Sequence, residues 1–86
     1  MMLEKRPAKD IMGKLVVTKE GKRLGMVKDI TIETRSGELI HLVLSSVTSY
    51  ALGLNLEKSK NSELLIPYSA ILAIGDFVVI NEEDVQ

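Results

Sequence analysis

The chain has 86 residues, of which 45% are hydrophobic and 27% are charged; this composition is typical of one soluble globular domain and excludes a largely disordered chain. Cysteine is absent, which excludes disulfides, thiolate nucleophiles and cysteine-built metal sites. The net charge of −1 combines a balance of +5 in residues 1–28 with one of −6 in residues 29–86, so the basic third either attracts phosphates or acidic partners or is simply a solvated face.

The N-terminus lacks the apolar core of a signal peptide, and no apolar run approaches the roughly 20 residues that cross a bilayer. We therefore expect a cytoplasmic protein with a single domain over residues 1–86. Its core should span about residues 8–80, between a short N-terminal lead-in and an acidic, mobile tail at 81–86.

The first elements predicted are a helical turn and a hairpin. The segment PAKDIM (7–12) favours one helical turn that begins at Pro7 and is closed by Gly13. The segment LVVT (15–18) is β-branched, the turn KEGK (19–22) contains a glycine, and extended structure resumes at 26–34.

The second strand has an irregular hydrophobic phase. Val27, Ile30 and Ile32 cannot all face inward at a period of two, because the first step is three residues. An extra residue near Lys28 and Asp29 would restore the phase, so we predict a β-bulge there. Gly25 would let this strand bend or let another backbone approach closely.

A third strand is predicted at 39–46, after a turn at 35–38 in which Gly37 adopts positive φ. Alternation assigns one set of side chains to the core and leaves the other on the outer side. The predicted core set is Ile40, Leu42 and Leu44, and the outer set is Leu39, His41 and Val43.

Strand signals fade over residues 47–63, where an apolar stretch predicts either a loose strand or a hydrophobic loop. They return at 64–80. Pro67 must end a strand or lie on an edge because it has no N–H to donate. Gly75 and Asp76 form the turn of a closing hairpin.

About six short strands joined by glycine-containing turns predict an all-β fold, a small β-barrel with β-hairpins and a bulged second strand. Closure of the barrel would remove the exposed strand edges. The residues with predicted structural roles in turns and the bulge are Gly21, Gly25, Asp29, Gly37, Pro67, Gly75 and Asp76.

Candidate chemistry is sparse. His41 is the only histidine and has no companion in sequence that would make it a catalytic base or a metal ligand. Asp29 and Asp76 could meet only through folding, and bulge and turn roles fit them better. We therefore expect no enzyme activity, no catalytic or metal-binding residues and no cofactor.

Surplus apolar residues point instead to a protein interface, because exposed apolar patches usually mark binding sites. We predict that this interface supports a homodimer or a closely related heterodimer. The alternative is that residues 47–56 fold over one mouth of the barrel. The predicted interface residues are Leu39, His41, Val43, Tyr50, Leu52, Leu54 and Leu56.

RNA binding is the alternative from another class. The aromatic residues that could stack on bases, Tyr50, Tyr68 and Phe77, lie away from the basic third, which makes nucleic acid an unfavoured partner. The basic residues concerned are Lys5, Arg6, Lys9, Lys14, Lys22, Arg23 and Lys28.

The order of these motifs resembles a known family. Two stretches, residues 8–45 and the closing segment LLIPYSAILAIGDFVVI (64–80), together resemble a PRC-barrel domain. The first stretch contains a lead-in glycine, the first hairpin, the step from Gly25 to Asp29 and the Gly37 turn. That family occurs in the H subunit of photosynthetic reaction centres and in a bacterial ribosome maturation factor. The chain is most similar to small stand-alone archaeal PRC-barrel proteins (CdpB type), some of which act in cell division.

The resemblance implies a non-enzymatic adaptor that binds proteins. By this likeness, the expected role is to link the SepF anchor of the FtsZ ring to other division proteins, with SepF and another PRC-barrel protein as partners and recruitment to the division site at the membrane. The alternative that it implies is a ribosome-assembly or RNA-processing factor. Fold likeness alone does not fix either role.

Overall fold

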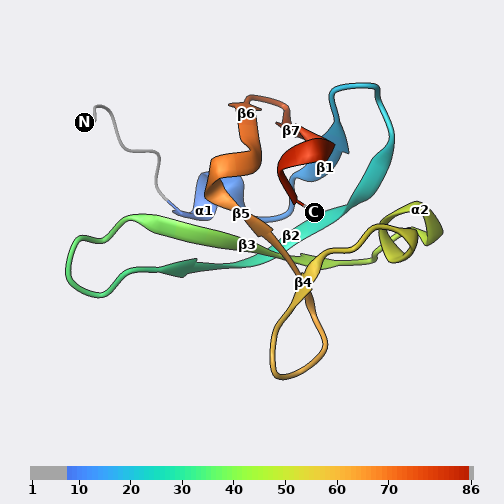
Figure 1. Ribbon diagram of the computed structural model, residues 1–86. Coiled ribbons are helices and arrows are strands. Elements are labelled where there is room, and N and C mark those ends of the chain that lie inside the picture. Colours follow the sequence, from blue (N-terminus) through green and yellow to red (C-terminus); the bar gives the residue numbers. More distant parts are fainter. Residues whose placement is uncertain (1–7, 86) are drawn as a thin grey trace.

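The computed structural model describes residues 8–85 and consists of one seven-stranded sheet with short helical segments (Figure 1). The all-β fold class is as predicted. The strands are β1 (Leu15–Thr18), β2 (Arg23–Ile32), β3 (Leu39–Ser45), β4 (Glu57–Lys58), β5 (Leu64–Pro67), β6 (Ile71–Ile74) and β7 (Phe77–Ile80). The helical segments are α1 (Ala8–Ile11), α2 (Ser49–Gly53) and the 3₁₀ turns η1 (Tyr68–Ala70) and η2 (Glu82–Val85).

The strand order is β4-β5-β3-β2-β1-β7-β6. Neighbouring strands are antiparallel except for β1 and β7, which run parallel. Figure 1 shows β6 and β7 standing above the long β2–β3 hairpin, so the sheet bends around its core. The expected closure is wrong in one respect, because β4 and β6 end the sheet as edges instead of pairing with each other.

The predicted bulge in the second strand is confirmed. Val27 pairs with Leu44 and Asp29 pairs with Val43, which leaves Lys28 as the extra residue. The Asp29 carboxylate accepts a hydrogen bond from the next backbone N–H at 2.8 Å and so supports the irregular backbone.

A second irregularity corrects the predicted core. Thr31 pairs with His41 while Ile32 pairs with Leu39, so Ile40 has no opposite residue. The side chains of β3 beyond this shift change faces, because strand alternation has a period of two. Ile40, predicted to be buried, is therefore exposed, and Leu39 packs partly against the core. Ile32, also predicted to be buried, keeps the phase of Ile30 but is the last residue of β2, and it is exposed.

Gly25 has the close-approach role predicted for it. A Cβ at this position would lie 2.7 Å from the Ser45 carbonyl oxygen. Only glycine lets β2 and the end of β3 pass so closely. The hydroxyl of Thr48 donates to the Arg23 carbonyl at 2.7 Å and fixes the chain where it leaves the sheet.

Residues 47–63 contain a helix and a short strand in place of the predicted loose strand or loop. Thr48 caps α2, because its hydroxyl accepts a hydrogen bond from the Ala51 N–H at 3.1 Å. β4 then pairs with β5. The helix was missed because its five residues are too few to show a helical period.

The turns agree with the sequence. Gly13, Gly21 and Gly37 have positive φ, Pro67 ends β5, and the segment with Gly75 and Asp76 joins β6 to β7. The predicted helical turn is confirmed at Ala8–Ile11, whereas Pro7 lies outside the described residues.

The tail is ordered as far as residue 85, contrary to the prediction of a mobile end. Glu82–Val85 form η2, in which the Asp84 N–H donates to the Asn81 carbonyl at 3.0 Å. Val85 is buried against the core. The burial of this apolar residue helps to hold the acidic tail on the domain.

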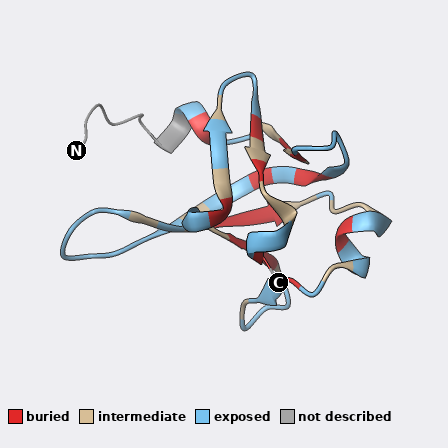
Figure 2. Cartoon of the chain, turned by 45° about the horizontal axis from the view of Figure 1, so that its top comes forward, coloured by how far each residue is buried: buried red, intermediate tan, exposed pale blue. Residues whose placement is uncertain are grey.

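The core lies on the concave side of the sheet, and Figure 2 shows the buried residues gathered near the centre while the turns are exposed. β1 and β7 contribute alternate residues to it. Those fully enclosed from these two strands are Val16, Thr18, Val78 and Ile80.

Candidate interaction surface

The structure separates the seven predicted interface residues into buried and accessible ones. Leu56 and Val43, only 6% and 8% exposed, are covered within one chain. Leu39 and Leu54 pack partly against the core. For Leu54 and Leu56, the alternative that residues 47–56 fold over the barrel is correct.

Two of the predicted residues remain accessible on α2. Tyr50 is 37% exposed and Leu52 is 64% exposed, the highest value among the large hydrophobic side chains described. Ala51, between them, faces the core and is fully buried. The helix is thus held by one face and presents the other to solvent.

His41 lies on β3 and has a partner on β4, the strand beyond β5. Its Nε2 is 3.3 Å from Glu57 Oε1. Among residues 8–85, no group of three or more histidine, cysteine, aspartate or glutamate side chains is placed to hold a metal ion.

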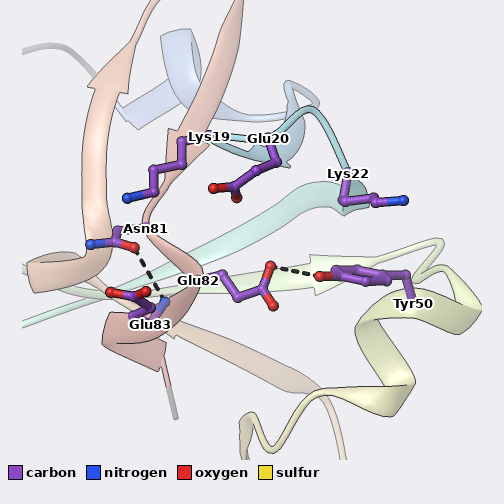
Figure 3. Close-up of a pocket in the computed structure, with 7 residues that line it drawn as sticks. All are labelled: Lys19, Glu20, Lys22, Tyr50, Asn81, Glu82 and Glu83. Carbon is purple, nitrogen blue, oxygen red and sulfur yellow. Dashed lines mark hydrogen bonds between the residues drawn. The ribbon is translucent and has the colours of Figure 1, made fainter.

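A polar hollow of about 290 Å³ joins α2 to the tail (Figure 3). Tyr50 points across it and donates a hydrogen bond to Glu82 Oε1 at 2.6 Å. The Lys22 ammonium lies 5.7 Å from the centroid of the Tyr50 ring, within range of a cation–π contact. The hydrogen bond to the Glu82 carboxylate raises the pKa of Tyr50, because only the protonated phenol can donate it. The hydrogen bond across this hollow therefore connects α2 to η2.

The basic third is partly engaged in contacts within the chain. Lys14 donates to the Gly75 carbonyl, and Lys28 forms an ion pair with Glu63. Hydrogen bonding to Glu63, followed by the attraction of its charge, raises the pKa of Lys28. Lys5 and Arg6 lie outside the described residues.

An apolar patch on the convex side of the sheet was not predicted from the sequence. Leu15 pairs with Met26 of β2 on one side and with Phe77 of β7 on the other. Paired residues share a face of the sheet, so these three side chains form one row. Met26 is 39% exposed and Phe77 is 52% exposed.

A second row lies beside the first. Val17 pairs with Arg23 of β2 on one side and with Val79 on the other, and Val79 in turn pairs with Ala73 of β6. Val17, Val79 and Ala73 are at least partly open to solvent, and the exposed Arg23 ends this row with a charge. We call the two rows together the outer face; its residues are Leu15, Val17, Met26, Ala73, Phe77 and Val79.

The outer face follows from a signal that is visible in the sequence. The segments LVVT and FVVI are apolar at nearly every position instead of alternating. Parallel strands with such continuous apolar runs are normally covered on both faces. Here β1 and β7 are parallel, yet only their inner face is enclosed by the described chain.

No helix within residues 8–85 is long and apolar enough to cross a membrane. The PRC-barrel domain family matches residues 4–86. The chain is also 30% identical over 84 residues to the Methanocaldococcus jannaschii protein named Uncharacterized protein MJ1118, an alignment that covers 98% of this chain and 90% of the relative. The bulge, the glycine turns and the closing β6–β7 hairpin agree with this assignment. The chain therefore belongs to the PRC-barrel domain family.

Proposed function

We propose that this protein is a non-enzymatic protein-interaction module and that a second copy of the chain binds its outer face. One observation carries the proposal: β1 and β7 are apolar on both faces, and one of those faces is open to solvent. Contiguous exposed apolar surface is typical of an interface.

The sizes of the side chains favour self-association. One row of the outer face holds the large residues Leu15 and Phe77, and the next holds the smaller Val17 and Val79. In a symmetric dimer, the twofold axis can run midway between the two rows and perpendicular to the strands. This axis would place the large side chains of each copy over the small side chains of the other. Packed sheets interdigitate in this way.

The size of the face sets the strength expected. Four strands spaced about 4.8 Å apart make it roughly 19 Å wide, and four residues make it about 13 Å long. A standard interface takes about 800 Å² from each partner, which is roughly one-seventh of the 5537 Å² surface of this chain. The flat area of the outer face is well below that, so we expect a dimer of micromolar affinity.

Light scattering coupled to size exclusion tests this surface. The wild type should approach twice the 9.5 kDa mass of the chain as its concentration rises, and Phe77→Ser should remain a monomer. The matched control is Leu52→Ser, which removes an even more exposed apolar side chain elsewhere. A wild type that stays monomeric at high micromolar concentration would contradict self-association.

We further propose a cellular role, that of an adaptor in archaeal cell division linking the SepF and FtsZ machinery to other division proteins, with SepF and another PRC-barrel protein as partners. Its support is the resemblance to the stand-alone archaeal PRC-barrel proteins, whereas the family match supports the coarser role of an interaction module. In this role the protein stays in the cytoplasm and is recruited to the membrane at the division site.

Gentle crosslinking of the tagged protein in its native cells, followed by mass spectrometry, tests the cellular role. Enrichment of SepF, FtsZ or another PRC-barrel protein is expected. Enrichment of ribosomal proteins and RNA without division proteins would overturn the role in favour of ribosome assembly. Binding to RNA would then also weaken steeply with salt, because phosphate contacts release counterions.

A further inference from the structure

A second hollow lies between α2, the end of β3 and the β4–β5 hairpin. Its volume is about 300 Å³. We call it the α2 groove; its apolar lining residues are Leu44, Val47, Leu52 and Leu64. Leu44 and Leu64 belong to the buried core and form the floor, whereas Leu52 is an exposed wall.

The backbone around the α2 groove is held in an unusual conformation. Ser46 and Ser62 are the two described residues other than glycine with positive φ, at 51° and 64°. Both line this groove. Non-glycine residues in this region are uncommon, and they gather at ligand clamps more often than elsewhere.

The chain on either side of the α2 groove is fixed as well. The close passage of Gly25 by the Ser45 carbonyl holds the end of β3. Two hydrogen bonds of the Thr48 hydroxyl then set the position of α2. Preformed walls of this kind reduce the entropy that a bound segment must lose.

The rim of the α2 groove is positively charged. Lys28, Lys58 and Glu63 are the charged residues that line it. Glu63 forms an ion pair with Lys28 and so offsets that charge. Lys58 makes no ion pair with any described residue, so the rim keeps a positive charge next to an apolar floor.

We propose that the α2 groove binds a segment of a partner protein in which a leucine-like side chain packs against Leu52 and a neighbouring acidic residue pairs with Lys58. The inference deepens the proposed interaction function and rests on it. The outer face and the α2 groove share no residue, and they adjoin where Met26 of the outer face pairs with Ser45 of the groove.

Selection from a phage-displayed library of random short peptides, followed by fluorescence anisotropy of the enriched peptide, tests the groove. The expected consensus joins a large aliphatic residue to acidic residues. Leu52→Ser should weaken binding about tenfold, because a leucine contact is lost. Lys58→Glu should weaken it about fivefold, with less dependence on salt.

The control is Phe77→Ser, which should leave peptide affinity unchanged while it removes the dimer. An enriched peptide that is basic, or whose affinity is insensitive to Leu52→Ser, would overturn the groove proposal and leave the outer face untouched. Loss of the dimer in Leu52→Ser would also overturn it, because the groove would then be a contact between copies. Failure to enrich any peptide has the same consequence.

Discussion

Replacement of Gly25 by alanine should destabilise the fold through a single backbone collision. The added Cβ would lie 2.7 Å from the Ser45 carbonyl oxygen, whereas ordinary contact begins at 3.4 Å. The end of β3 must therefore retreat by about 0.7 Å. The obstructing atom belongs to the backbone, so no side-chain rotation relieves it.

The expected cost is about 1–3 kcal/mol, the range for overpacked sites. A domain of this size has a stability of roughly 4–13 kcal/mol. One kcal/mol shifts Tm by about 4–8 °C at this length, so Gly25→Ala should lower Tm by about 5–20 °C. Thermal unfolding followed by far-UV circular dichroism measures the shift.

Gly53→Ala is the matched control for this experiment. Its Cβ would meet nothing within 4 Å, and alanine is favoured over glycine at the end of a helix by up to about 1 kcal/mol. Its Tm should be equal to or slightly above that of the wild type. If Gly25→Ala were as stable as Gly53→Ala, the close approach of β2 and β3 could not be the reason for glycine at this position.

Two further predictions concern the tail and the polar hollow. Val85→Ala should lower the free energy of unfolding in urea by about 1–2 kcal/mol, because two methylene equivalents leave the core; an unchanged midpoint would show that η2 does not stabilise the domain. The pKa of Tyr50 should lie above its ordinary value of 10.0, because the protonated hydroxyl donates a hydrogen bond to Glu82. The stabilisation from this contact is therefore fully present below about pH 10 and is lost as the pH rises through the pKa of the folded state. The Tyr68→Phe variant leaves Tyr50 as the only tyrosine, so a pH titration followed by tyrosinate absorbance reports on Tyr50 alone. The midpoint should lie above 10.0, and adding Glu82→Gln should lower it towards 10.0. A midpoint at or below 10.0 in Tyr68→Phe would contradict the hydrogen bond.

Local sequence signals predicted the features that depend on neighbouring residues. The phase break at Val27 located the bulge, and Gly25 signalled the close approach of β3. The same reasoning failed at Ile40, because the second register shift between β2 and β3 leaves no trace in the sequence of either strand alone. The register between two strands depends on which face of each strand is buried in the folded sheet, and the sequence of one strand does not contain that information.

For Leu54 and Leu56, the prediction of an accessible surface was wrong for a related reason. Leu54 and Leu56 looked like surplus apolar surface because the capped helix that turns this segment over the core was not foreseen. The open surface is on β1 and β7, whose continuous apolar pattern was visible. This pattern predicts an open apolar surface only when β1 and β7 are known to be parallel neighbours. The sequence does not show this, because more than 55 residues separate the two strands.

The most direct test of the account is the mass of the protein in solution across a range of concentrations, for the wild type, Phe77→Ser and Leu52→Ser. We predict a mass that rises from 9.5 kDa towards twice that value for the wild type and Leu52→Ser, and a constant 9.5 kDa for Phe77→Ser. A monomeric wild type, or a dimer that Phe77→Ser leaves intact, would contradict the claim that the outer face binds a second copy.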